Sequence, residues 1–291
     1  MKEISDNEIR VIGTDSEDVA KASKRHGKAI IIAAIVVAAA IIAALLIWHH
    51  NVIKSPEKAF FDSSTVETDA QPNIRTIDSD PDTIVGITMR DTTVNDIPLK
   101  IFTPHNLHAR LHVGELNYAT ADTNIVLALQ AADIRADNLE IVSAFVLNGE
   151  TLAKGSSKLG YCALINDTVT IGVDSATALY EEAIEKGGDF FRQYPLVKNG
   201  NIVENKIKNK AIRRALAEID GHITVVATSS RESLHDFAQA LVDIGVNTAV
   251  NLVGGNLISG WVVAGDSLVI DEQPILNGPS PNNINFIILS K

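Results

Sequence analysis

The sequence predicts an α+β domain with a mostly antiparallel mixed sheet and two or three helices, preceded by one transmembrane helix. Three observations lead to this fold class. A run of twenty residues near the N-terminus is wholly apolar. The C-terminal part alternates short apolar runs with turn residues, which is typical of strands. Two later segments carry apolar residues at helical spacing.

The apolar run extends from Ala29 to Trp48 and contains no charged residue, glycine or proline. At about 1.5 Å of rise per residue, a helix of this length spans roughly 30 Å, the thickness of the hydrocarbon core of a bilayer. A buried core helix rarely stays apolar on every face for so long. A cleaved signal peptide has a shorter apolar region that ends in a small-residue cleavage site. An uncleaved signal anchor that contacts the lipid bilayer is therefore expected.

Basic residues on the two flanks predict the orientation. The N-terminal flank carries Lys21, Lys24, Arg25 and Lys28. The C-terminal flank has two lysines and soon becomes acidic. Because positive flanks stay in the cytoplasm, we expect a single-pass protein of the plasma (inner) membrane with a cytoplasmic N-terminus. The C-terminal domain is then periplasmic or extracellular.

Composition divides the chain into a cytoplasmic tail (1–28), the membrane helix (29–48), a polar flexible linker (49–82) and a folded domain (83–291). The net charge of −11 argues against nucleic acid as a partner, because phosphates need a basic surface. The one cysteine, Cys162, lies in an apolar run and is expected to be a buried hydrophobe without a disulfide.

The folded domain begins with expected strands at 83–89, 97–102 and 107–113. The apolar run Asn124–Ile134 is compatible with a strand or a short helix. Hairpins are expected around Asn148-Gly149 and Asn166-Asp167, because these dipeptides favour two-residue turns. Helical spacing then predicts helices over Ser175–Gln193 and Glu232–Gly245. Further strands are expected at 221–230, 248–255, 261–270 and 285–290.

Histidines and glycines suggest two kinds of site that also have plain structural explanations. His105, His108 and His112 lie close together in sequence, as in a metal site. His108 and His112, however, share one face of an expected strand, which indicates a half-solvated strand more than a metal site. Gly254-Gly255 follows an apolar strand; its amides could approach an anion, although paired glycines also make ordinary tight turns. No nucleotide or metal motif occurs, so we expect no cofactor and no metal.

Two charged pairs are candidates for chemistry. Asp133 and Arg135 end an apolar run, where such side chains often line a cleft but also form ordinary surface ion pairs. Arg213-Arg214 precede another apolar run. Paired arginines suit bidentate phosphate recognition, and a solvated charge pair is the alternative.

Four ordered segments resemble the phosphodiester glycosidase family, whose domain occurs in the enzyme that uncovers mannose-6-phosphate by removing N-acetylglucosamine from a phosphodiester. The resemblance covers about residues 95 to 290. Gly187–Gly200 is similar to the family's Gly-Gly-Pro-leucine-leucine segment. Ile212–Thr228 resembles its Arg-Thr-Ala-Ile-Gly strand, and Ser233–Gly255 resembles the helix and strand that end in Asn-Leu-Asp-Gly-Gly-Gly-Ser. Pro281–Ile288 resembles the closing strand.

The sequence departs from the family at chemically important positions. Val253 stands where the family loop has an aspartate, and Asn256 stands where it has a third glycine. The family's Asn-Gly-Gly-Phe segment is replaced by Ala132-Asp133-Ile134-Arg135. Arg213, Asn251, Gly254 and Gly255 match the family's residues.

The resemblance implies a hydrolase that cleaves sugar-1-phosphodiester (glycan–phosphate) linkages in the cell envelope. Arg213 and the Gly254-Gly255 amides would bind the phosphate, and Asp133 would act as general acid or base. The other expected substrate-binding residues are Arg135, Asn251 and Asn256.

Glycoside hydrolysis usually needs two carboxylates about 5–10 Å apart, and Asp189 or Glu218 are candidates for the second. Two alternatives stay open. One is an inactive glycan- or phosphoglycan-binding domain with the same fold, and the other is a structural envelope protein that serves partners.

Overall fold

The computed structural model describes residue 42 and residues 74–76, 84–254, 260–272 and 283–291. Of these residues, 52% lie in strands and 10% in helices. The two helices are α2 (Thr177–Glu185) and α3 (Leu234–Asp243). The predicted α+β class is therefore wrong, because the described part of the chain is a mostly β structure with two short helices.

No helix among the described residues is long and apolar enough to cross a bilayer. The predicted transmembrane segment Ala29–Trp48 lies outside them, apart from Ile42. The predicted tail also lies outside the described residues. Most of the predicted linker does so too, but its residues Ile74–Thr76 form a strand, β1, that pairs with the folded domain.

Eighteen strands form three antiparallel sheets in this part of the chain. The strands of sheet A, in spatial order, are β1 (Ile74–Thr76), β9 (Thr168–Val173), β8 (Gly160–Ile165), β10 (Asp189–Gln193), β6 (Phe145–Leu147) and β7 (Glu150–Ala153). The strands of sheet B are β12 (Asn201–Ile202), β11 (Pro195–Lys198), β15 (Val246–Leu252), β13 (Arg214–Ile219), β14 (His222–Thr228), β3 (Ile97–His105) and β2 (Gly86–Val94). The strands of sheet C are β17 (Ser267–Glu272), β16 (Gly260–Ala264), β5 (Ile125–Gln130), β18 (Asn285–Ser290) and β4 (His108–Val113).

The hairpin turns form where the sequence predicts them. Asn148 and Gly149 have φ angles of 48° and 80°, and Asn166 and Asp167 have 50° and 61°. These are the left-handed conformations that a two-residue hairpin turn requires, and asparagine, aspartate and glycine adopt them at least cost. The turns connect β6 to β7 and β8 to β9.

The first predicted helix is shorter than expected. Helix α2 ends at Glu185, and Gly187 follows it with a φ of +67°. Gly188 packs so closely that a Cβ atom there would lie 2.8 Å from the carbonyl oxygen of Leu164. The chain then continues as β10, whose five residues are all buried. Residues 189–193 therefore belong to a central strand of sheet A.

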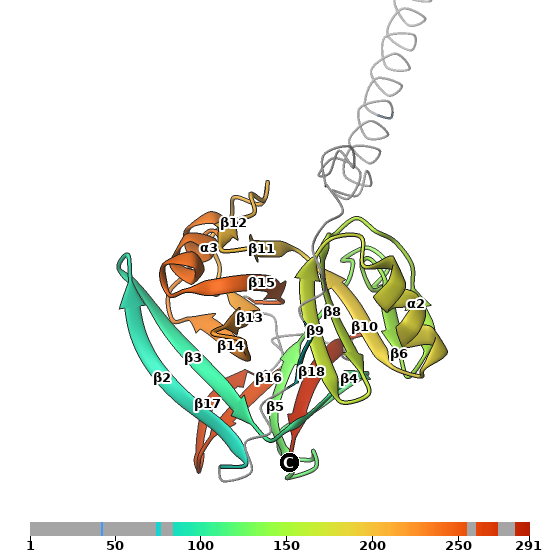
Figure 1. Ribbon diagram of the computed structural model, residues 1–291, viewed down its shortest axis with the longest axis horizontal. Coiled ribbons are helices and arrows are strands. Elements are labelled where there is room, and N and C mark those ends of the chain that lie inside the picture. Colours follow the sequence, from blue (N-terminus) through green and yellow to red (C-terminus); the bar gives the residue numbers. More distant parts are fainter. Residues whose placement is uncertain (1–41, 43–73, 77–83, 255–259, 273–282) are drawn as a thin grey trace, which may run out of the picture. The chain divides into compact units, whose positions relative to one another are not determined.

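One central core joins the three sheets, and Figure 1 shows them grouped around it. Leu129 from sheet C, Phe191 from sheet A and Leu216 from sheet B all belong to this core. The other face of sheet B is covered by α3, and the other face of sheet A is covered by α2. Each sheet is thus buried on its inner face by the other two sheets.

Three strands end together at one end of this core. The amide of Val253, just after β15, donates to the carbonyl of Gln130 at the end of β5 (3.0 Å). The amide of Asn251 donates to the carbonyl of Tyr194, which follows β10 (2.9 Å). The segments that leave β5, β10 and β15 are therefore neighbours in space although they are far apart in sequence.

Candidate functional site

A buried ion pair lies where these three strands end. The ammonium group of Lys158, just before β8, is 2.5 Å from Oδ2 of Asp133, in the segment that follows β5. The Lys158 side chain is 2% exposed and the Asp133 side chain is 34% exposed. A buried ammonium is costly unless it is paired and hydrogen-bonded. Asp133 meets this need while keeping part of its carboxylate open to solvent.

The other partners of Lys158 come from the end of β10. Its Nζ atom donates to Oε1 of Gln193 (2.9 Å) and lies 4.4 Å from the centroid of the Tyr194 ring. Gln193 is fully buried, and its Nε2 atom donates to the carbonyl of Ala131 (3.2 Å). Lys158 is therefore held by a carboxylate, an amide oxygen and an aromatic face, which fixes the ammonium group in one position.

A second buried cation reaches the same region from sheet B. Arg214, the first residue of β13, is 1% exposed, and its Nη1 atom donates to the carbonyl of Val253 (3.3 Å). The amide of Val253 is hydrogen-bonded to the carbonyl of Gln130, and Gln130 directly precedes Ala131. A continuous series of contacts thus connects Arg214 with Asp133. We refer to Asp133, Lys158, Gln193, Tyr194 and Arg214 as the site cluster.

Arg192 fixes the backbone around Lys158. Its guanidinium donates to the carbonyls of Lys158 (3.1 Å), Asp174 (3.1 Å) and Ser175. Burial lowers the pKa of Arg192 from its ordinary value, because a buried site disfavours the charged form. These bonds tie the segment before β8 to the end of β9, so the Lys158 backbone is anchored independently of its side chain.

Asn285 positions the backbone before Asp133. The amide of Ala132 donates to Oδ1 of Asn285 (2.7 Å), and Nδ2 of Asn285 donates to the carbonyl of Ala132 (3.1 Å). Asn285 is the first residue of β18 and is fully buried. Both main-chain groups of Ala132, its amide and its carbonyl, are thereby satisfied away from water. Asp133 is therefore presented from a fixed backbone.

The structure brings three of the predicted site residues to this end of the core. Asp133 belongs to the site cluster, and Asn251 lies near the end of β15 with 7% exposure. Gly254 packs against the segment before β13. A Cβ atom at position 254 would lie 2.2 Å from the carbonyl oxygen of Ile212, so only glycine fits there. Gly255 and Asn256 lie outside the described residues.

The two other predicted arginines have different partners. The guanidinium of Arg213 donates to the carbonyl of Glu232 (2.8 Å) and to Asn209. Its pKa is lowered mainly by burial and also by the charge of Arg231. Arg135 forms two hydrogen bonds with Asp137, at 2.8 and 2.7 Å. Both side chains hold their own loops together through these bonds.

The two candidates for a second carboxylate lie elsewhere in the sheets. Asp189 is at the start of β10, four residues before Gln193, and a strand of this length spans about 13 Å. Its carboxylate accepts from the amides of Leu111 (2.7 Å) and Asn148 (2.7 Å). Glu218 is buried within β13, four residues after Arg214. Asp189 is therefore engaged at the opposite end of β10 from Gln193.

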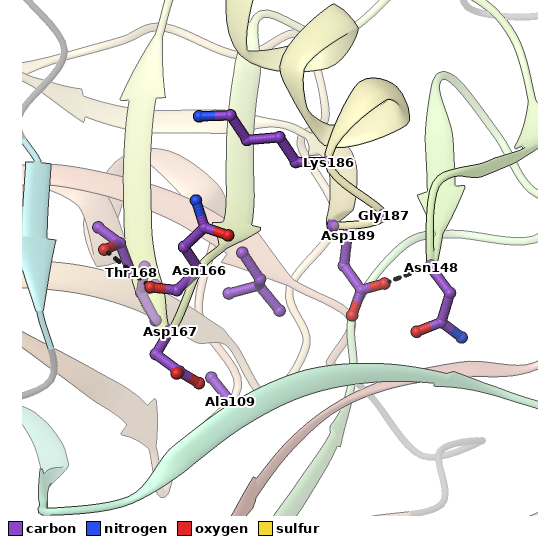
Figure 2. Close-up of a pocket in the computed structure, with 11 residues that line it drawn as sticks. Ala109, Asn148, Asn166, Asp167, Thr168, Lys186, Gly187 and Asp189 are labelled. Carbon is purple, nitrogen blue, oxygen red and sulfur yellow. Dashed lines mark hydrogen bonds between the residues drawn. The ribbon is translucent and has the colours of Figure 1, made fainter.

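A separate cavity of about 250 Å³ lies at the Asp189 end of β10, and Figure 2 shows the polar side chains around it. Its polar residues have structural roles. Asn148, Asn166 and Asp167 occupy left-handed turn positions, and Lys186 pairs with Glu182 (2.6 Å). Turn formation explains why these residue types stand there. The site cluster, at the other end of β10, is therefore the stronger candidate for catalysis.

Three members of the site cluster were not predicted from the sequence, and Arg214 was considered only as part of the Arg213-Arg214 pair. Lys158, Gln193 and Tyr194 have no local pattern that marks them. Arg214 could have been separated from Arg213 by strand alternation, because adjacent residues at the start of a strand point to opposite faces. The structure places Arg214 on the face of the central core residue Leu216.

The histidines that the sequence analysis weighed as a metal site are His105, at the end of β3, and His108 and His112 on β4. His108 is exposed and its Nδ1 atom is 3.4 Å from Oδ1 of Asp167. Across the part of the chain that the structure describes, no group of three or more His, Cys, Asp or Glu side chains is arranged to hold a metal ion.

Comparisons with known proteins agree with this architecture. Solved structures that are similar in fold include the following two. One is the catalytic domain of zebrafish N-acetylglucosamine-1-phosphodiester α-N-acetylglucosaminidase, auto-inhibited by its pro-peptide, with a TM-score of 0.55, 16% identity and coverage of 76% of this chain and 88% of that one. The other is a hypothetical protein from Synechocystis, with a TM-score of 0.53, 15% identity and coverage of 77% of this chain and 65% of that one.

At such identities these structures show the fold alone. A search of curated proteins found no match. The sequence profile of the phosphodiester glycosidase family matches residues 123–286, which is more than half of the chain. The match includes every residue of the site cluster. The chain therefore belongs to the phosphodiester glycosidase family.

Proposed function

We propose that the protein hydrolyses sugar-1-phosphodiester linkages of envelope glycans, with Asp133 as the reacting carboxylate. The observation that carries the proposal is the Asp133–Lys158 pair, a partly exposed carboxylate fixed by a buried ammonium at 2.5 Å. Family membership supplies the reaction class. The Asp133–Lys158 pair supplies a positioned carboxylate that can carry out this reaction.

Asp133 acts as nucleophile or general base at the anomeric carbon. In the base role, its carboxylate accepts a proton from water as the water oxygen bonds to the anomeric carbon and the carbon–oxygen bond to phosphate breaks. The products are the free sugar and a phosphomonoester. Lys158 holds this carboxylate in place through the ion pair at 2.5 Å.

One carboxylate is sufficient for this leaving group. Glycosidases with a sugar hydroxyl as leaving group need a second carboxylic acid to protonate it. A phosphomonoester, whose second pKa is about 6, leaves as a stable anion without that help. The valine at position 253, where the family loop carries aspartate, is then compatible with hydrolysis.

Arg214 and the segment after β15 are proposed to bind the phosphate. Arg214 is buried and already contacts the Val253 carbonyl, so its guanidinium is fixed beside this segment. A preorganised guanidinium stabilises the charge that develops on the departing phosphate. The sequence analysis expected Arg213 to bind the phosphate. We assign this role to the adjacent Arg214 instead.

The proposed location is the outer side of the plasma membrane, with the N-terminus in the cytoplasm. The support is the apolar run Ala29–Trp48 and the basic residues that precede it. Envelope glycans lie within reach of a domain in that position. The location is tested by fusing residue 291 to a reporter enzyme that is active only outside the cytoplasm. A second fusion carries a reporter that is active only in the cytoplasm. Activity of the second fusion and none of the first would contradict the proposed location.

An activity screen tests the proposed reaction. The full chain is incubated with methyl phosphodiesters of glucose-1-phosphate, N-acetylglucosamine-1-phosphate and related sugars, and released sugar is measured. Asp133→Asn should lower kcat by about 100-fold or more. Arg214→Lys should lower kcat/KM by about tenfold or more, since lysine lacks the planar fork of donors.

Arg213→Lys is the matched control and should keep activity within about threefold, because its guanidinium is engaged with the carbonyl of Glu232. Wild-type levels in Asp133→Asn would remove Asp133 from the mechanism. Activity lost in Arg213→Lys but kept in Arg214→Lys would reverse the arginine assignment.

A non-catalytic binding protein is the second candidate. What favours it is that Asp189, a candidate for the second carboxylate, is instead engaged by the amides of Leu111 and Asn148. This candidate predicts that no sugar is released while sugar-1-phosphodiesters still bind, with affinity reduced in Arg214→Lys. Calorimetric titration alongside the activity screen separates the two.

A further inference from the structure

Positive charge is concentrated on one loop of this acidic chain. Lys206, Lys208 and Lys210 lie between β12 and β13, and Arg231 lies in the adjacent loop before α3. All four residues are exposed, while the whole chain has a net charge of −11. We refer to these four residues as the cationic platform.

The platform is built on an ordered backbone. Ala211 and Glu232 exchange two main-chain hydrogen bonds, at 3.1 and 2.8 Å, which join the two loops. Nη2 of Arg231 donates to the carbonyl of Lys210 (3.1 Å). At the other end, Nδ2 of Asn205 donates to the carbonyl of Pro195 on β11 (2.7 Å).

The lysines alternate with residues that face the domain. Asn205 is buried and Ile207 packs against the core under α3, whereas Lys206 and Lys208 are exposed. This period of two places those two lysines on the outer side of the loop. The loop therefore presents a row of ammonium groups to solvent from a fixed support.

Carboxylates lie beside some of these cations. Glu232 lies 3.6 Å from the Lys210 ammonium, and Glu204 pairs with His235 at 2.7 Å. Arg213 adds a further guanidinium close to the platform. The charge of Arg231 also helps to lower the pKa of Arg213, which agrees with the closeness of the two guanidinium groups.

The platform borders the candidate site. Its loop leads through Ile212 into β13, and Gly254 packs directly on the Ile212 carbonyl. Gly254 follows Val253, the residue that contacts Arg214 of the site cluster. The platform loop and the site cluster are thus connected through Ile212, Gly254 and Val253.

We propose that the cationic platform binds a glycan chain that carries repeating phosphates and thereby holds it next to the site cluster. The proposal rests on the proposed function in one respect, namely that the site acts on such a chain. Lysine ammonium groups act as point charges and bind phosphates without a demanding geometry, which suits a flexible polymer. A platform outside the site would favour polymers over single sugar phosphates.

An anionic membrane surface is the competing partner. Membrane-docking segments place large apolar side chains beside their cations. The exposed large hydrophobic residues of the described chain lie on other elements and include none on the platform loops. The observations thus favour a soluble polyanion.

A binding experiment that needs no turnover tests the proposal. The full chain is titrated with long-chain inorganic polyphosphate, with tripolyphosphate and with phosphatidylcholine–phosphatidylglycerol vesicles. We expect tight binding to long-chain polyphosphate and weaker binding to tripolyphosphate. The affinity for the long chain should fall as the salt concentration rises, because binding releases about three counterions from its phosphates.

The triple variant Lys206→Gln, Lys208→Gln and Lys210→Gln should weaken binding to long-chain polyphosphate by at least about tenfold. The matched control replaces the exposed lysines 154, 186 and 291 by glutamine and should change it by less than about twofold. Thermal unfolding of both variants checks that they fold.

Equal weakening in the two triple variants would overturn the proposal, because net charge alone would then explain binding. Platform-dependent binding to vesicles without binding to polyphosphate would also overturn it and assign the platform to a membrane. Asp133→Asn should bind polyphosphate like the wild type. Failure of the hydrolysis proposal and failure of the platform proposal are therefore distinguishable.

Discussion

Lys158 Nζ lies 2.5 Å from Asp133 Oδ2, and the two partners differ sharply in exposure, at 2% and 34%. This difference in exposure predicts that removing the two side chains lowers the free energy of unfolding by unequal amounts. Asp133→Ala leaves a buried ammonium without its counter-charge, and we expect a loss of about 3 kcal/mol in the free energy of unfolding. Lys158→Met leaves a carboxylate that water still reaches, and we expect about 1 kcal/mol. Urea denaturation measures both, and equal costs would contradict the asymmetry.

Asn285 gives a second prediction, about the peptide next to Asp133. Asn285→Leu keeps the volume but leaves the buried amide and carbonyl of Ala132 without partners. The expected loss of stability is about 2–4 kcal/mol. Asn283→Ala, which removes a bond to the Leu139 carbonyl in an exposed setting, is the control and should cost less than about 0.5 kcal/mol. Similar costs for the two variants would argue against a clamping role.

Cys162 is expected to be inert in the folded protein. It is fully buried on β8, and burial raises the pKa of its thiol, so the reactive thiolate is suppressed. A thiol reagent at pH 8 should label the chain only after unfolding, with a rate that follows the unfolding equilibrium. Rapid labelling under native conditions would show that the β8 region opens locally.

Asp137 is expected to titrate well below an ordinary carboxyl. The hydrogen bond from Arg135 lowers its pKa from 3.8 to about 2. Because the pKa of Asp137 is depressed in the folded state, its ionised carboxylate stabilises the folded protein above about pH 4. This stabilisation is lost as the pH falls towards about 2. NMR titration of the carboxyl carbon measures the pKa, and Arg135→Gln should return it towards 3.8. A wild-type pKa near 3.8 would rule out the pairing in solution.

Local patterns predicted the elements better than the fold class. The turns at Asn148-Gly149 and Asn166-Asp167 follow from residue types that tolerate positive φ angles. Helix α3 lies within the predicted Glu232–Gly245, and the Ser233 side chain caps it by accepting from the amide of Asp236 (3.0 Å). The class was wrong because helical spacing continued past Glu185 into residues that tertiary packing made a strand.

The site was less predictable because its contacts are long-range. Asp133 was identified because it ends an apolar run, and it does line the site cluster. Lys158 contacts residues 25 and 35 positions away, and a lysine between Ser157 and Leu159 carries no local sign of burial. Arg213 matched the family pattern, yet the carbonyl of Glu232 engages its guanidinium. Strand alternation separates the two arginines, but the partners of each guanidinium are visible only in the three-dimensional arrangement.

Strand β18 places a constraint on the order in which the domain is made. It lies between β4 and β5 in sheet C, and Ser290 pairs with Ile125 across 165 residues of sequence. At roughly 5–20 residues per second, a ribosome takes on the order of ten seconds or more to make the intervening chain. Throughout that time β5, all of whose residues are buried in the finished sheet, has no β18 partner. A newly made chain therefore exposes an aggregation-prone strand until residues 285–290 arrive, so a chaperone that shields residues 125–130 would be needed most during synthesis.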